Sequence, residues 1–246
     1  MFPRTDARTV ADDGDTLHFC STCAFSQACL SEGMDKQELL DLHVLVEHVG
    51  PLHANDHVFR KGDPFDAIAA VRAGTVKTYV VDREGHERVL GFHLPGEVIG
   101  LDAIDGNAYP CNAIALDIVT LCRFSFPRMA ELAARAPGLQ QHLFRLLSRD
   151  IGAAMRMAGD WSADQRMAAF LVALSRRYAQ RGFSPVRFHL TMSRTDIANY
   201  LRLAPETVSR VLRRFQAEGL VEVERREVVL GDPARLAELA RPVLRA

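Results

Sequence analysis

The stretch from Ser193 to Phe215 constrains the fold of this chain most, because it encodes two short helices joined by a tight turn. Ser193 followed by Asp196 is typical of the side-chain cap that begins a helix. Pro205 suits the first turn of a second helix, where its missing N–H leaves no hydrogen bond unmade. A turn at residues 203–204 separates the two helices. This pattern predicts a helix-turn-helix.

The second of these helices has two different faces. Its apolar residues would point into a domain core: Val208, Val211, Leu212 and Phe215. The opposite face carries Glu206, Ser209, Arg210 and Arg213. Arginine bonds O6 and N7 of guanine, glutamate accepts from the cytosine amino group, and serine bonds base edges or phosphates. We expect Glu206, Ser209 and Arg210 to read the major groove of double-stranded DNA. The alternative is a solvated face with a Glu206–Arg210 pair.

Residues 219–230 predict two strands around a charged turn, which would form a wing beside the helix-turn-helix. Arg225 and Arg226 at its tip are placed to reach phosphates. Further contacts with the DNA backbone are expected from Arg194, Arg202, Arg213 and Arg214.

Three of the five cysteines, Cys20, Cys23 and Cys29, have the spacing C-x2-C-x5-C. An odd count with three clustered thiols indicates metal or redox chemistry. Four thiolates would hold an iron–sulfur cluster or a tetrahedral zinc ion, and ordinary reduced thiols are a third interpretation. A fourth ligand would come from Cys111 or Cys122, and His18 is a substitute ligand for zinc.

Between Pro51 and Phe126, short β-rich runs alternate with turns. The run at 76–81 leads through a polar turn into a second run at 88–92, and glycines recur every ten to twelve residues. This rhythm predicts a small antiparallel roll or barrel. Residues 35–49 show near-helical spacing of apolar residues.

A helical region follows from Pro127 to Trp161, with a break at 137–138. An apolar seam at spacings of three and four consists of Phe144, Leu147, Ile151, Ala154, Ala158 and Trp161. We interpret the seam as the interface of a homodimer. The alternative is a helix packed on its own domain. The expected α+β chain has a cysteine-rich segment (1–34), a β-roll (35–135), a dimerisation helix (136–161) and a winged helix-turn-helix (162–246).

Composition limits the classes of function. The net charge of -1 requires any DNA-binding surface to be local. The sequence shows neither a signal peptide nor a membrane span, so we expect a cytoplasmic protein without membrane contact. No nucleophile triad, phosphate-binding loop or pair of catalytic carboxylates stands out, so we expect no enzyme.

The chain resembles the FNR-type oxygen sensors of the CRP/FNR superfamily. The resemblance covers about residues 18–240, and its motifs are the C-x2-C-x5-C run and the segments 92–104, 174–185 and 206–210. It implies a [4Fe–4S] cluster on Cys20, Cys23, Cys29 and Cys122, with Cys111 as an extra thiol. It also implies recognition of TTGAT half-sites, in which Arg210 reads the guanine and Glu206 the cytosine opposite it.

The resemblance implies a cyclic-nucleotide-binding-like β-roll, but we expect no cyclic nucleotide. Relatives that bind one use an Arg-Ser or Arg-Thr pair, and the corresponding Tyr109-Pro110 offers no cation. The resemblance also implies contact with RNA polymerase at residues 82–87 and 183–188, and ordinary surface loops are the alternative interpretation of both segments. Relatives often carry acidic residues in the dimer seam, whereas here Asp150 flanks the seam and Ala154 lies in it. This predicts a weaker monomer–dimer switch. A zinc or thiol switch in the same DNA-binding scaffold is the alternative to an iron–sulfur cluster.

Overall fold

The computed structural model describes residues 29–30, 34 and 36–245. They form two compact units, one of residues 29–148 without 87–89 and one of residues 87–89 and 149–245. The expected α+β class is confirmed, with an antiparallel roll, a long helix and a winged helix-turn-helix in that order. Within the described residues, no helix combines the length and the apolar character that crossing a membrane requires.

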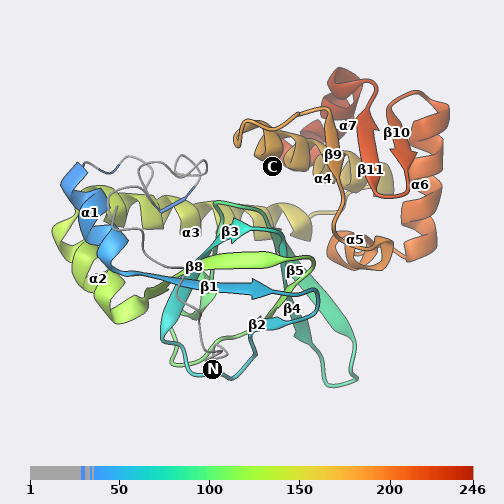
Figure 1. Cartoon of the computed structure of the whole chain (residues 1–246). Helices are drawn as coiled ribbons and strands as arrows, with labels where there is room; N and C mark the ends of the chain where they lie inside the picture. The colour runs from blue at the N-terminus through green and yellow to red at the C-terminus, as the bar shows by residue number, and fades with distance from the viewer. Residues whose placement is uncertain (1–28, 31–33, 35, 246) are drawn as a thin grey trace. The chain divides into compact units, whose positions relative to one another are not determined.

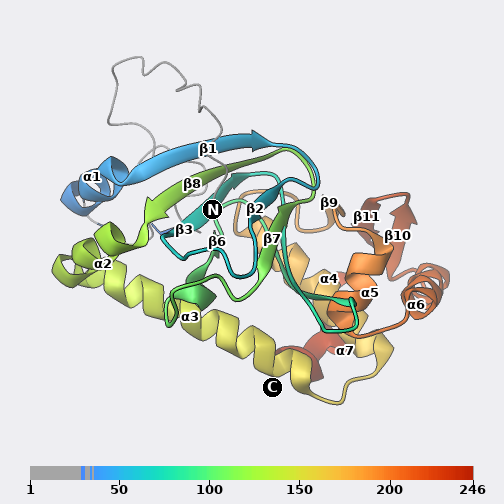
Figure 2. The same ribbon diagram turned by 90° about the horizontal axis from the view of Figure 1, so that it is seen from below.

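Two four-stranded sheets form the roll of the first unit (Figures 1 and 2). One sheet has the order β1 (Val46–Leu52), β8 (Val119–Ser125), β3 (Ala67–Ala73) and β6 (Val98–Ile99). The other has the order β2 (His57–Phe59), β7 (Asn112–Ala115), β4 (Val76–Val81) and β5 (Glu87–His93). The predicted roll is confirmed, and its strands pair antiparallel. The run at 76–81 and its neighbour at 87–93 are the adjacent strands expected from the sequence.

The interior of the roll is filled by aliphatic and aromatic side chains. Tyr109 stacks on Phe59 with ring centroids 4.0 Å apart and an interplanar angle of 10°. Phe65 meets the edge of the same tyrosine ring at 5.4 Å. The Tyr109 hydroxyl donates to the Ala67 carbonyl, and burial raises the pKa of this phenol. Residue 109 is therefore a core residue of the roll.

A second apolar cluster covers the other face of β8. There Phe124 packs with Met129 and Leu132 of α2 (Phe126–Arg135) and with Leu139 of α3 (Pro137–Ala158). We expected Ile118, Thr120, Cys122 and Phe124 to share one face of a strand. Ile118 instead precedes β8 and is 64% exposed, and both faces of β8 contribute to apolar clusters.

Helix α1 (Lys36–Val44) is shorter than the pattern at 35–49 predicts. Val46 and Val49 lie on β1, opposite Phe124 and Leu121 of β8, so pairing with β8 overrides the helical spacing. Helices α1 and α2 lie side by side at one end of the roll (Figures 1 and 2).

Helix α3 presents two kinds of surface. Leu139, His142 and Leu146 are buried, at 0%, 0% and 9% exposure. Phe144 and Ile151 of the predicted seam are 62% and 61% exposed, and Ala154 is exposed too. Leu147 packs partly against the apolar cluster of its own unit. One face of the helix therefore packs on its own domain, as the alternative interpretation expects, and the other face is exposed, as a dimer interface would require.

The seam needs a correction at its end. Trp161 lies beyond the last residue of α3, and its Nε1–H donates to the Arg156 carbonyl at 2.9 Å. It closes the end of the helix and does not continue the helical face. Met155 is 71% exposed on α3 and was absent from the predicted seam. Ala158 is the last helical residue, and its side chain lies outside the described part.

The second unit contains α4 (Ala163–Ala179), α5 (Arg194–Leu201), α6 (Pro205–Ala217) and α7 (Pro233–Arg245). A three-stranded sheet accompanies them, in the order β10 (Val221–Glu224), β11 (Glu227–Leu230) and β9 (Arg187–His189). Capping boxes begin α4 at Ser162 and α5 at Ser193. The predicted helix starts, the turn and the two-stranded wing are confirmed.

Candidate functional site

Helix α6 is built to expose one face. Arg202 ends α5 in the left-handed conformation, with φ 54° and ψ 47°, and Pro205 opens α6 after an extended residue. The four predicted core residues of α6 are between 0% and 3% exposed: Val208, Val211, Leu212 and Phe215. The opposite face carries Glu206, Arg210 and Arg213, all exposed, and Ser209, which is half-buried. The polar groups that would read bases are thus open to a partner.

The predicted phosphate contacts fall into different environments. Arg202 and Arg213 are exposed, as a contact with DNA requires. Arg214 instead forms an ion pair with Asp164 in the first turn of α4. This guanidinium holds α6 to α4, a role that its position in the sequence did not reveal.

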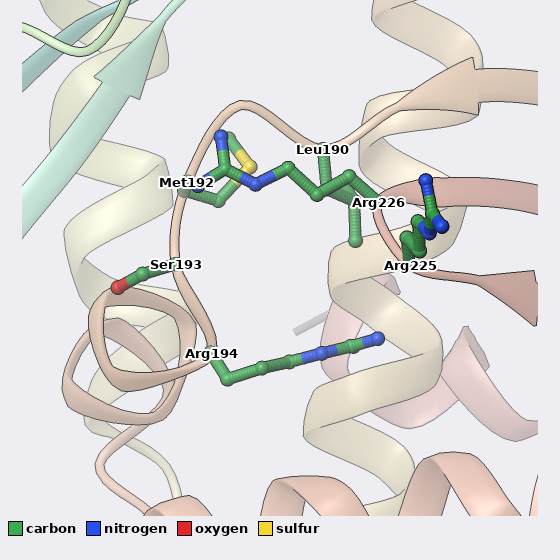
Figure 3. A pocket seen from close by; sticks show the side chains of 6 residues that line it. All are labelled: Leu190, Met192, Ser193, Arg194, Arg225 and Arg226. Atoms are coloured by element: carbon green, nitrogen blue, oxygen red, sulfur yellow. The ribbon is translucent and has the colours of Figure 1, made fainter. Parts of the chain in front are cut away.

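Arg194 belongs to a pocket of about 320 Å³ between the start of α5 and the wing. Figure 3 shows Arg194 along one side of this pocket and Arg226 along the other, with Arg225 beside them. The Nη1 atom of Arg194 is buried without a hydrogen-bond partner in the described structure, and burial lowers the pKa of this guanidinium. A buried cationic donor gains most from an anion. The pocket therefore has the charge and size for a phosphate group.

Two of the four predicted metal ligands fall within the described residues. Cys29 and Cys122 are both half-buried, and both pack against the apolar cluster formed by Phe124, Met129 and Leu139. Cys20 and Cys23 lie outside the described part of the chain. A thiol that precedes α1 and a thiol of β8 thus pack against the same apolar cluster.

Cys111 has a different environment. It is 1% exposed inside the roll, and its thiol donates to the Asp102 carboxylate at 3.3 Å. Burial, and then the nearby carboxylate, raise the pKa of Cys111, so the thiol stays protonated. The thiolate is the metal-binding form of cysteine. Cys111 therefore differs from Cys122, which is half-buried and packs against the same apolar cluster as Cys29.

His48 lies directly opposite Cys122 in the pairing of β1 with β8. Its Nδ1 atom is 3.8 Å from the Cys122 sulfur. Partial burial lowers the pKa of His48, and the nearby Arg72 and His43 lower it further. The sequence offered no reason to single out this histidine, because the pairing partner of residue 48 is known only from the sheet register.

A third group of ligand-type side chains occupies the turn between β4 and β5. Ligand atoms of Asp82, Glu84 and His86 lie within 4.8 Å of one another, and all three residues are exposed. The Asp82 carboxylate accepts the backbone N–H groups of Glu84 and His86 at 2.9 Å. These bonds shape the turn, which accounts for the cluster.

Family models match both units of the chain. A cyclic nucleotide-binding domain matches residues 50–136, and a Crp-like helix-turn-helix domain matches residues 165–239. The transcriptional activator protein anr of Pseudomonas aeruginosa is 42% identical over 224 residues, which cover 90% of this chain and 92% of that protein. The chain belongs to the CRP/FNR family, in its FNR-type branch.

Other members agree with this assignment. The fumarate and nitrate reduction regulatory protein of Escherichia coli is 38% identical over 236 residues, covering 95% of this chain and 94% of that protein. The solved structure of FixK2 from Bradyrhizobium japonicum superimposes with a TM-score of 0.71 at 26% identity, covering 79% of this chain and 96% of that one. The relatives from Pseudomonas aeruginosa and Escherichia coli are transcriptional regulators and not enzymes. This chain is accordingly a DNA-binding transcriptional regulator.

Proposed function

We propose that the chain is an oxygen-responsive transcriptional regulator whose Cys20, Cys23, Cys29 and Cys122 hold a [4Fe–4S] cluster. The observation that carries this proposal is the packing of Cys29 and Cys122 on one apolar cluster. Four thiolates are the usual ligand set of such a cluster, and the two described ones are half-buried. The names of the FNR-type relatives are consistent with it.

When bound, the cluster supplies an oxygen-labile connection between the N-terminal cysteines and the roll. Cys122 anchors that connection on β8, whose Phe124 packs in the same cluster as Leu139 of α3. A movement of Cys122 is thereby transmitted to α3, the helix that carries the exposed apolar face. A coupling of about 1–3 kcal/mol between the cluster and dimerisation changes DNA occupancy about 5- to 150-fold.

Dimerisation uses the exposed side of α3. Phe144 and Ile151 are one heptad apart, and both are more than half exposed. Leu147 and Ala154 complete the same region of the helix. Because Ala154 offers no charge to oppose pairing, we expect some dimer to persist after the cluster is lost. A dimer places two recognition helices about 34 Å apart, one turn of DNA.

Recognition of a TTGAT half-site follows from the exposed face of α6. Arg210 reads the guanine through O6 and N7, Glu206 accepts from the cytosine opposite it, and Ser209 bonds a base edge or a phosphate. Arg202, Arg213 and the Arg194 pocket supply phosphate contacts. RNA polymerase is the further partner, at the exposed turn 82–86 and the exposed loop 183–186. The ends of the two expected ranges need a correction, because Glu87 begins β5, and Arg187 and Phe188 lie on β9 with Phe188 buried.

Oxygen, and not a cyclic nucleotide, is the proposed signal. The Tyr109 ring stacks on Phe59 inside the roll, and its hydroxyl is engaged with the Ala67 carbonyl. Neither Tyr109 nor Pro110 provides the cation that a cyclic phosphate needs.

The test is binding of the full-length chain to a TTGAT palindrome and to a scrambled duplex, before and after exposure to air. We expect tight, sequence-dependent binding by brown, anaerobically prepared protein and a loss of at least about fivefold in air. Colourless, zinc-loaded protein with the same binding in both conditions would replace the iron–sulfur account with a zinc or thiol switch.

A further inference from the structure

His48, Cys122 and Ala70 form one row across three neighbouring strands. His48 of β1 and Ala70 of β3 are both direct pairing partners of Cys122 on the central strand β8. Direct partners in antiparallel strands project from the same face of a sheet. Ala70 is 2% exposed in the apolar cluster that Cys122 also contacts, so this row faces that cluster.

The two neighbours of Cys122 differ in what they offer its sulfur. Ala70 presents only a methyl group. His48 presents an imidazole whose Nδ1 is 3.8 Å from Sγ, within the range of a hydrogen bond to sulfur. The acidic groups nearby are engaged by Arg123, which bonds Glu47 and Asp66 at 2.7 Å each. Arg123 follows Cys122 and therefore projects from the opposite face of the strand.

We propose that His48 is a positioning residue for Cys122, donating an imidazole N–H to its sulfur when that sulfur binds the cluster. This inference rests on the proposed function, because it takes Cys122 as a thiolate ligand. Groups that hydrogen-bond to a metal ligand orient the ligand and tune the metal. Their loss can lower the affinity for the metal by about 10- to 100-fold. Hydrogen bonds to the sulfurs are among the factors that set the reduction potential of an iron–sulfur centre.

The expected direction follows from electrostatics. A donor to the sulfur draws electron density away from it and so favours the more electron-rich, reduced state. The same bond holds the side chain of Cys122 in the orientation needed for binding. Removing the donor should therefore lower the reduction potential and speed the loss of iron to a competing chelator.

The test compares three variants of the full-length protein, prepared anaerobically with iron and sulfide. His48→Leu removes the donor, His48→Gln keeps an N–H donor, and His53→Leu is the matched control. His53 is another roll histidine, with a side chain 76% exposed beside Asp56. The readouts are the rate of iron transfer to a chelator without oxygen, and the reduction potential.

His48→Leu should release iron about fivefold faster. The same factor in the redox equilibrium corresponds to a potential lower by about 40 mV for one electron. His48→Gln should stay within about twofold of the original protein, and His53→Leu should match it.

Wild-type values in His48→Leu would overturn the inference and leave the proposed function intact. Equal effects of His48→Leu and His48→Gln would overturn it too, since a merely structural role predicts no rescue by the donor. A wild-type chain that takes up no iron would overturn the proposed function and this inference together.

Discussion

Cys29 and Cys122 pack against the same apolar cluster, although one precedes the first helix and the other lies on the last strand of the roll. Cys29 is thereby placed against the same cluster as Phe124 of β8 and Leu139 of α3. The same packing separates Cys122 from Cys111, which lies in the other apolar cluster, inside the roll.

Replacing Cys122 by serine should abolish iron binding and air-dependent DNA binding, because serine supplies no thiolate. Cys111→Ala is the control, since Cys111 bonds Asp102 inside the roll. Iron content and binding to a TTGAT duplex are measured for both variants. Loss of iron in Cys111→Ala with retention in Cys122→Ser would reverse the assignment of the fourth ligand.

Arg210→Ala should weaken binding to TTGAT by about 1–3 kcal/mol and reduce discrimination at the guanine, because a bidentate contact with that base is lost. The control is Arg241→Ala, which removes an exposed arginine from α7. This variant should bind the TTGAT duplex as tightly as the wild type. Competition among duplexes with each base at that position is the measurement. Unchanged base preference in Arg210→Ala would argue against readout by this side chain.

Arg194→Met should act differently from Arg210→Ala. If the pocket of Arg194, Arg225 and Arg226 holds one DNA phosphate, the salt dependence of log K should become shallower by about 0.9, with base preference unchanged. Titrations at several salt concentrations measure this slope. The idea fails if the slope stays the same while the protein remains folded.

Ile151→Glu should raise the dimer dissociation constant of the cluster-loaded protein at least about tenfold, since burial of such a side chain contributes about 1.5–3 kcal/mol. Ile118→Glu is a matched control, because Ile118 is 64% exposed and Ile151 is 61% exposed. Sedimentation at micromolar concentration distinguishes the two. A dimer that tolerates glutamate at 151 would place the interface elsewhere. Sedimentation of the cluster-free wild type, showing monomer alone, would contradict the predicted residual dimer.

Cys111 predicts an alkaline loss of stability. Its pKa is raised in the folded protein, whereas the unfolded thiol ionises near pH 8.5. Above about pH 8.5 the thiol ionises in the unfolded chain but not in the folded protein. The free energy of unfolding is therefore highest below about pH 8.5 and falls above it, by up to about 1.4 kcal/mol per pH unit. Urea unfolding of the cluster-free protein at several pH values should show a steeper decline for wild type than for Cys111→Ala. Parallel curves would contradict this.

Local sequence patterns correctly predicted the helices that begin with a capping residue or a proline. Ser162, Ser193 and Pro205 begin helices as expected, because caps and helix starts depend on neighbouring residues. The helical spacing at 35–49 wrongly predicted helix at Val46 and Val49. Both residues lie on β1, and their pairing with β8 involves residues more than 70 positions away in the sequence.

The relationships that the sequence did not predict all depend on tertiary neighbours. Arg214 pairs with Asp164, His48 lies opposite Cys122, and Arg194 shares a pocket with the wing arginines. None of these three partners is evident from the residue's own segment. The exposed face of α6 could be predicted because all of its residues belong to one helix.

The most direct measurement is the content of iron and acid-labile sulfide per chain in anaerobically purified protein, followed through exposure to air. The account predicts about four of each per chain, lost in air together with most of the dimer and most of the specific DNA binding. Two results would contradict the account: protein that contains no iron, and protein that keeps its iron in air and binds DNA equally well before and after exposure.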